Sequence, residues 1–308
     1  NLGLIFNKLE ENEKAKECYE KTIELNPNYA NAHNNLGNIF NELREIKKAK
    51  ECFEKAIELN PNHSDAYYNL GVIFNELREI KKAKECYEKI IKLNPNYTKA
   101  HYNLGVIFNE LGEKQKAKEC YEKTIELNPN YANAHYNLGL IFNKLEENEK
   151  AKECYEKTIE LNPNYANAHN NLGVIFNELG EKQKAKDCYE KAIKLNPNYV
   201  NAHNNLGIIF NELGDIKKAK ECYEKAIKLN PNYTKAHYNL GVIFNELGEK
   251  QKAKECYEKT IELNPNYANA HYNLGLIFNK LEENEKAKEC YEKTIELNPN
   301  YANAHNNL

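Results

Sequence analysis

Nine cysteines and nine histidines are the residues of this 308-residue sequence whose chemistry is best suited to catalysis or metal binding. The cysteines recur every 34 residues from Cys18 to Cys290. Eight histidines follow the same period from His33 to His305, with Tyr67 in place of one of them. A zinc ion needs its ligands to converge to about 2 Å. Equivalent residues of successive repeats should lie about one helix diameter apart, ~10 Å. Neither series therefore predicts a metal site or a disulfide.

No motif for phosphate, dinucleotide, zinc-hydrolase or serine-hydrolase chemistry accompanies these residues. We therefore predict no catalytic residue, no metal and no cofactor, and we expect that the chain is not an enzyme by itself. Unpaired thiols persist in reducing compartments, so we expect a cytoplasmic location.

The charge balance argues against two classes of partner. Lys and Arg number 43 and Asp and Glu number 46, giving a net charge of −3. This balance provides no long-range attraction to nucleic acid or to an anionic membrane. The sequence also lacks an apolar run of about 20 residues, so we predict no membrane span.

A 34-residue repeat organises the chain, and proline marks it most clearly. The nine prolines are all 34 residues apart and run from Pro27 to Pro299. Residues 30–63 show one unit, in which two amphipathic segments have apolar residues at helical spacing. We expect a turn between the two helices at Arg44, where four other units have Gly, and an end to the second helix before Pro61. We also expect a small-residue contact between Gly37 and Ala49 within the hairpin.

The spacing within each unit resembles the tetratricopeptide repeat family. In residues 30–63 the matching positions are His33, Leu36, Gly37, Phe40, Ala49, Phe53, Ala56 and Pro61. The resemblance implies an all-α fold, a right-handed superhelical solenoid of antiparallel helix hairpins. It also implies a scaffold that binds other proteins.

We interpret residues 1–308 as a single array. Its partial units are 1–29 and 302–308, and its full units are 30–63, 64–97, 98–131, 132–165, 166–199, 200–233, 234–267 and 268–301. The chain begins and stops at the same repeat phase, inside a first helix. Ends of this kind favour head-to-tail self-association or a longer array.

One position on the first helix holds Asn in every unit. We call these residues the ladder asparagines: Asn35, Asn69, Asn103, Asn137, Asn171, Asn205, Asn239 and Asn273. They resemble the asparagines of the repeat domain of O-linked N-acetylglucosamine transferases, which hold the main chain of an extended peptide on the concave face. A side-chain amide offers both a donor and an acceptor, as a peptide unit does.

The neighbours of the ladder vary between units and could supply specificity. The residue before the ladder position is either Asn or a tyrosine, namely Tyr68, Tyr102, Tyr136, Tyr238 and Tyr272. A second polar row includes Asn41, Asn75 and Asn109, and Val174 and its equivalents could form an apolar floor. We predict a groove that binds an extended or disordered segment of another protein.

Three alternatives remain open at this stage. The chain could be the substrate-docking region of a larger transferase or other multidomain enzyme. It could be a structural, self-stacking solenoid. The ladder could also have been copied by duplication without being used, because residues 1–34 recur at 137–170 and 273–306.

Overall fold

The computed structural model describes residues 3, 5–6, 9 and 11–308 of the chain. Two compact units are distinguished by their internal contacts, which we call the N-terminal unit (Asn1–Glu146) and the C-terminal unit (Glu147–Leu308). All regular secondary structure in the described residues is helical. The predicted all-α fold is therefore confirmed.

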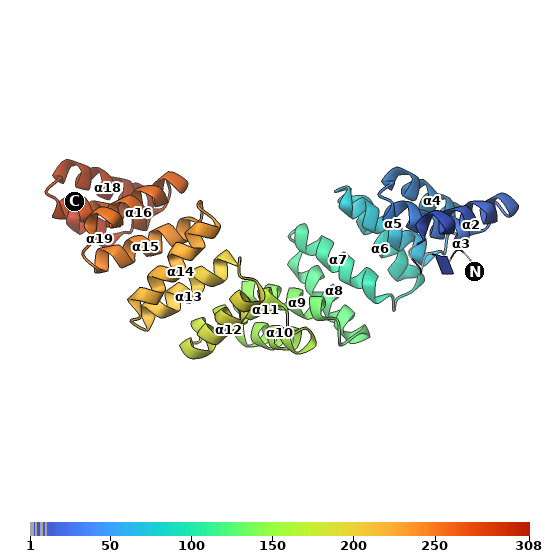
Figure 1. The fold of residues 1–308 in the computed structure, drawn as a ribbon, viewed down its shortest axis with the longest axis horizontal. Helices are drawn as coiled ribbons and strands as arrows, with labels where there is room; N and C mark the ends of the chain where they lie inside the picture. Colours follow the sequence, from blue (N-terminus) through green and yellow to red (C-terminus); the bar gives the residue numbers. More distant parts are fainter. Residues whose placement is uncertain (1–2, 4, 7–8, 10) are drawn as a thin grey trace. The chain divides into compact units, whose positions relative to one another are not determined.

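The helices come in two alternating kinds, as the repeat predicted (Figure 1). In the N-terminal unit they are α2 (Asn12–Leu25), α3 (Ala30–Glu42), α4 (Ile46–Leu59), α5 (Ser64–Glu76), α6 (Ile80–Leu93), α7 (Thr98–Glu110), α8 (Lys114–Leu127) and α9 (Ala132–Lys144). In the C-terminal unit they are α10 (Asn148–Leu161), α11 (Ala166–Glu178), α12 (Lys182–Leu195), α13 (Val200–Glu212), α14 (Ile216–Leu229), α15 (Thr234–Glu246), α16 (Lys250–Leu263), α17 (Ala268–Lys280), α18 (Asn284–Leu297) and α19 (Ala302–Asn307).

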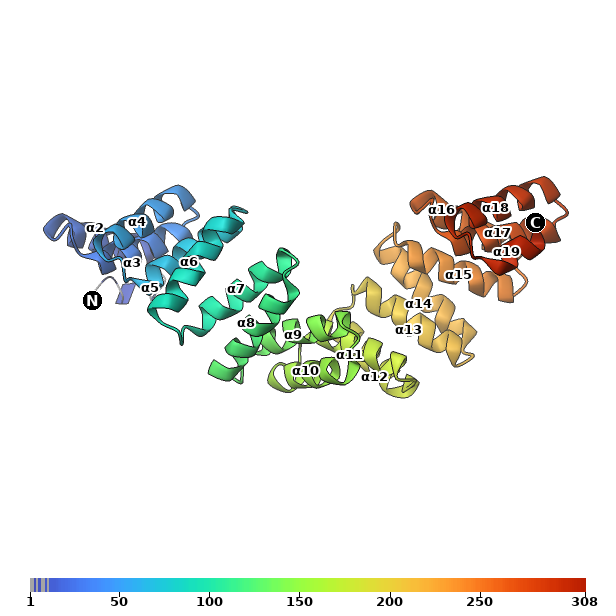
Figure 2. The ribbon, with the colours of Figure 1, turned by 180° about the vertical axis from the view of Figure 1, so that it is seen from behind.

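Each helix packs mainly on its neighbours in sequence. In the N-terminal unit α3 packs on α4 and α4 on α5, and in the C-terminal unit α11 packs on α12 and α12 on α13. The view from behind shows the same succession within each unit (Figure 2). A single hairpin cannot bury its apolar face alone, so the core is a continuous layer shared between successive hairpins.

The closest approach within a hairpin joins a glycine to an aromatic ring. A Cβ atom on Gly105 would lie 2.7 Å from the ring of Tyr121, and one on Gly37 would lie 2.6 Å from the ring of Phe53. The nearest atoms to Gly37 belong to Phe53, and the expected contact between Gly37 and Ala49 stays a prediction. The glycine leaves room for the ring of the second helix, which is then almost fully buried.

The turn inside each hairpin needs a left-handed backbone, which explains the glycines there. Gly112 has a φ of 78° and Gly180 one of 77°, whereas Arg44 and Arg78 adopt a φ of 61° at the equivalent position. L-residues pay about 1–2 kcal/mol for this conformation because Cβ crowds the following carbonyl. The predicted turn is confirmed, and among the described residues four hairpins form it with Arg or Glu and four with Gly.

The loop between successive hairpins is held by hydrogen bonds from side chains. The helix α4 ends at Leu59, before Pro61, as predicted. The Oδ1 of Asn60 then accepts a hydrogen bond from the backbone N–H of Asn62 at 3.1 Å. Further along, His101 contacts the carbonyl oxygen of Pro95 through Nε2 at 2.8 Å, so this nitrogen carries the proton and donates. Seven other histidines make the same contact and lock the loops to the first helices.

Burial makes the cysteine thiols hard to ionise. It raises the pKa of Cys52 to about 11 and that of Cys86, Cys188 and Cys222 to about 12. None of the nine cysteines takes part in a disulfide bond. Such thiols behave as small apolar side chains at neutral pH.

We expect Arg44→Gly to stabilise the fold. Glycine relieves the cost of the left-handed turn but gives more freedom to the unfolded chain, so the net gain should be about 0.5–1 kcal/mol. Urea denaturation followed by circular dichroism measures this change. The reverse variant Gly112→Arg is the matched control and should destabilise by a similar amount. A gain in both variants, or a loss in both, would contradict this account of the turn.

We expect stability to fall as the pH rises from 8 to 9.5. The folded chain holds its thiol protons more tightly than the unfolded chain, whose cysteines ionise near pH 8.5. Unfolding therefore releases protons in this window, and a higher pH favours the unfolded state. Urea midpoints at several pH values measure the slope. The triple variant Cys86→Ala, Cys188→Ala and Cys222→Ala should show a shallower slope, and an unchanged slope would refute this assignment.

Candidate functional site

The eight ladder asparagines lie in the middle of the first helices and are half-buried. Where the preceding hairpin has Asn before its ladder residue, the two amides bond to each other. The Nδ2 of Asn69 donates to the Oδ1 of Asn34 at 3.1 Å, and that of Asn239 donates to the Oδ1 of Asn204 at 3.0 Å. The ladder therefore joins successive hairpins, a role that sequence reasoning did not foresee.

Where the preceding hairpin has Tyr, the phenol replaces the amide as acceptor. The Nδ2 of Asn137 donates to the hydroxyl of Tyr102 at 3.2 Å, and that of Asn273 donates to the hydroxyl of Tyr238 at 3.2 Å. The sequence contains a signal for this contact, because the residue before each ladder asparagine is always either Asn or Tyr. Its meaning depends on the distance between hairpins, which the sequence does not contain.

The ladder amides of Asn137, Asn239 and Asn273 keep part of their hydrogen-bonding capacity for a ligand. The other ladder amides use more of theirs within the protein: the Oδ1 atoms of Asn35, Asn171 and Asn205 each accept from the preceding asparagine, and the Nδ2 atoms of Asn69 and Asn103 each donate to two side chains. A carboxamide has two N–H donors and an acceptor oxygen. The contact with the preceding hairpin uses one N–H, and none of the described residues donates a side-chain hydrogen bond to the Oδ1 of Asn137, Asn239 or Asn273. The amide is thus oriented by the protein while one donor and one acceptor stay available.

The predicted specificity tyrosines form columns of stacked rings. The ring centroid of Tyr102 lies 6.0 Å from that of Tyr121 on the second helix and 4.9 Å from that of Tyr131 on the next hairpin. Burial raises the pKa of Tyr131 to about 12. Tyr68, Tyr238 and Tyr272 stand in equivalent columns, and Tyr136 is half-buried at the same position.

The second polar row lies apart from the ladder. Asn41, Asn75 and Asn109 are half-buried in the last turns of α3, α5 and α7. Each follows its ladder residue by six positions, which places it roughly 240° around the helix axis. The structure therefore does not bring the two rows onto one side of the helix, and a binding role for this row stays a prediction.

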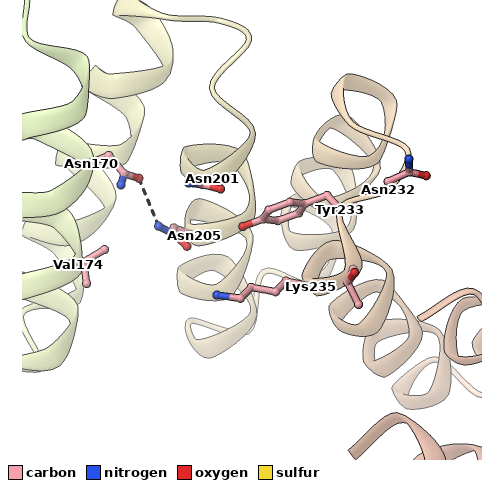
Figure 3. A pocket seen from close by; sticks show the side chains of 8 residues that line it. Asn170, Val174, Asn201, Asn205, Asn232, Tyr233 and Lys235 are labelled. Carbon is pink, nitrogen blue, oxygen red and sulfur yellow. Dashed lines mark hydrogen bonds between the residues drawn. The ribbon is translucent and has the colours of Figure 1, made fainter. Parts of the chain in front are cut away.

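A cleft of about 630 Å³ opens over three first helices of the C-terminal unit (Figure 3). α11 provides Asn170 and Val174, α13 provides Asn201 and Asn205, and the start of α15 with the preceding loop provides Asn232, Tyr233, Thr234 and Lys235. The volume lies within the usual range of ligand sites, about 300–1,000 Å³. The lining is rich in amides and hydroxyls, with one aromatic ring and one ammonium group.

The cleft contains one of the predicted ladder residues, Asn205, together with residues that sequence reasoning missed. Asn201, Asn232, Tyr233 and Thr234 lie at the loop and the first turn of a helix. Tyrosine recurs at the position of Tyr233 in seven other units, which was the available signal. It looked like a loop residue because it lies outside the periodic apolar pattern.

The chemistry of the remaining polar groups is limited. No group of three or more His, Cys, Asp or Glu side chains in the described part of the chain could hold a metal ion. The raised pKa values of the thiols leave little nucleophilic thiolate at neutral pH. Among the described residues, no helix is both long enough and apolar enough to cross a bilayer.

Comparison with family models identifies the repeat. The tetratricopeptide repeat matches residues 30–63, 64–97, 98–131, 132–165, 166–199, 200–233, 234–267 and 268–301. A second model, described as a TPR repeat, matches residues 3–43. No curated protein matches the chain.

Several solved structures share the fold. YrrB, described as a TPR protein with an unusual peptide-binding site, is 28% identical with a TM-score of 0.51, and the match covers 61% of this chain and 97% of YrrB. PilF of Pseudomonas aeruginosa is 22% identical with a TM-score of 0.62, covering 68% of this chain and 95% of PilF. The APC/C hetero-tetramer Cut9–Hcn1 matches at 16% identity and a TM-score of 0.64, covering 96% of this chain and 58% of that chain.

The 34-residue period, the helix hairpins and the glycine–aromatic contact agree with these matches, and the protein belongs to the tetratricopeptide repeat family.

Proposed function

We propose that this protein is an interaction scaffold that binds an extended segment of another protein along the ladder asparagines. The observation that carries the proposal is the hydrogen bond from six ladder amides to the preceding hairpin, such as Asn239 to Asn204 at 3.0 Å. This bond orients the amide before a ligand arrives. Binding then costs less side-chain entropy than it would with a freely rotating amide.

The remaining capacity of the ladder fits a peptide backbone. An amide with one free N–H and a free oxygen can donate to a carbonyl and accept from an N–H of an extended chain. Contacts of this kind recognise the backbone and tolerate many side chains, so specificity must come from neighbouring residues. YrrB, which has a similar fold, is described as a TPR protein with a peptide-binding site, and this supports the proposal that the present chain binds a peptide.

The partner would be a protein segment that is extended or disordered before it binds. The near balance of 43 basic and 46 acidic residues does not favour a highly charged partner. A cytoplasmic location fits the unpaired thiols, because disulfides are rare there. A role as the docking region of a larger enzyme is compatible with this function, and the gene sequence flanking residues 1 and 308 would decide it.

We expect the ladder to be needed for peptide binding. A random-peptide display selection on the chain identifies ligands, and fluorescence polarisation measures the affinity of the enriched peptides. The triple variant Asn205→Ala, Asn239→Ala and Asn273→Ala removes three amide contacts worth about 1 kcal/mol each. Peptides that bind the C-terminal unit should weaken by roughly 100-fold.

A matched control makes the same substitution in loops outside both polar rows. The variant Asn198→Ala, Asn266→Ala and Asn300→Ala changes three exposed loop asparagines of the C-terminal unit and should bind these peptides like the parent. Circular dichroism at the assay temperature checks that both variants are folded, because the ladder variant also loses bonds between hairpins. Equal weakening by both variants would count against the ladder. No enriched peptide at all would favour a self-stacking structural role, which light scattering would reveal as a mass that grows with concentration.

A further inference from the structure

The cleft over α11, α13 and α15 lies where another hairpin of the same chain holds a tyrosine ring. The segments 98–131 and 234–267 are identical in sequence, and each follows a tyrosine, Tyr97 or Tyr233. They differ in the hairpin that precedes them. That hairpin has Tyr68 in the N-terminal unit and Asn204 at the equivalent position of the C-terminal unit. The chain therefore contains a filled and an open version of one site.

In the filled version, Tyr68 contacts residues of the next hairpin. Its ring centroid lies 5.7 Å from that of Tyr97, and the Nζ atom of Lys99 lies 5.8 Å from the same centroid. Aromatic pairs are favourable at centroid distances of about 4.5–7 Å, and an ammonium group is attracted to a ring face within about 6 Å. The ring of Tyr68 thus has both an aromatic and a cationic neighbour.

In the open version, Asn204 is too short to reach the same space. It is buried, and its Oδ1 accepts the hydrogen bond from Asn239 at 3.0 Å. Tyr233 and Lys235 remain in place and line the cleft of about 630 Å³, with both side chains directed across it (Figure 3). Within the described residues, Tyr233 has no ring partner, and Lys235 has neither an ion pair nor a ring beneath it.

We propose that this cleft binds an aromatic side chain of the partner segment, placed against Tyr233 and Lys235 as Tyr68 is placed against Tyr97 and Lys99. The proposal rests on the proposed function and names the side chain that the groove selects. Asn201 and Asn205 lie beside the ring of Tyr233 and offer amides to the backbone on either side of the bound residue.

The lining of the cleft disfavours an aliphatic side chain. Val174 is its one aliphatic branched residue, while four of its eight lining residues are asparagines. An aliphatic group would cover these amides without bonding to them, which is unfavourable. An aromatic ring instead offers a π face to the ammonium group of Lys235 and a stacking surface to Tyr233.

The test uses an acetylated and amidated pentapeptide with tyrosine at its centre, flanked by alanine and glycine. Saturation-transfer-difference NMR detects weak contact between the tyrosine ring and the full chain. We expect a ring signal with the parent that falls about tenfold with Asn204→Tyr, because the new ring fills the cleft as Tyr68 does. The same pentapeptide with leucine at its centre should give little signal with either chain.

Two further variants keep the test decisive. Asn34→Tyr makes the same substitution at a hairpin that is followed by His63 in place of tyrosine, so the signal should stay at the parental level. Tyr68→Asn opens the filled version of the site and should raise the signal by adding a second cleft with Tyr97 and Lys99. This gain does not depend on the folding of the Asn204→Tyr variant.

Three results would each overturn the proposal of an aromatic cleft. They are an equal ring signal from the parent and Asn204→Tyr, no gain of signal from Tyr68→Asn, and equal binding of the leucine peptide. The proposed function would survive these results if display selection still yielded ladder-dependent peptides without an aromatic residue. A failed selection together with a positive ring signal would leave the cleft intact and remove the extended ladder as the binding mode.

Discussion

The contact on which the rest of the structure depends is the aromatic ring of each second helix against the glycine of its first helix. A Cβ on Gly105 would lie 2.7 Å from the ring of Tyr121, so only glycine leaves room for the ring at this position. The ring is almost fully buried, with 1% of its surface exposed. The ladder asparagine precedes this glycine by two residues in the same helix. The contact between the glycine and the ring therefore also positions the ladder asparagine relative to the second helix. The Nδ2 of Asn103 even lies 3.4 Å from the hydroxyl of the buried Tyr87 on the preceding second helix.

In the proposed function the ladder contributes to both packing and binding. Ladder amides such as those of Asn69, Asn137 and Asn239 donate to the preceding hairpin, which holds successive hairpins in register and fixes the direction of the amide. At Asn137, Asn239 and Asn273, no described side chain donates to the amide oxygen. A row of such amides suits the regular backbone of an extended peptide, and it does so without needing charged side chains.

The residue before each ladder asparagine, either Asn or Tyr, makes the surface differ between otherwise similar repeats. Tyrosine completes a column of three rings, as Tyr102 does between Tyr121 and Tyr131, and so fills the surface. Asparagine accepts the same hydrogen bond but is too small to fill the space. Two successive hairpins have asparagine at this position, Asn170 and Asn204. The cleft that Tyr233 and Lys235 line opens over the first helices of these hairpins. The equivalent place in the N-terminal unit also has Asn38 and Asp65 where the cleft has Val174 and Asn201, so a few changes between near-identical repeats separate the two surfaces.

The sequence by itself determined the hairpins, because their signals are local. Apolar residues at helical spacing, the glycine or arginine of the turn and the proline after each second helix place α3 and α4 within a residue or two of their observed bounds. It also singled out the ladder and the variable tyrosines. Tertiary structure decided what these residues contact: the ring of Phe53 lies nearest to Gly37, and the amide of Asn69 bonds to Asn34 of the previous hairpin. These contacts depend on the distance and rotation between helices, which arise from packing and are absent from any periodic pattern. For the same reason Tyr233, a residue that lies outside the apolar pattern, was recognised as part of a cleft only once three successive first helices were seen together.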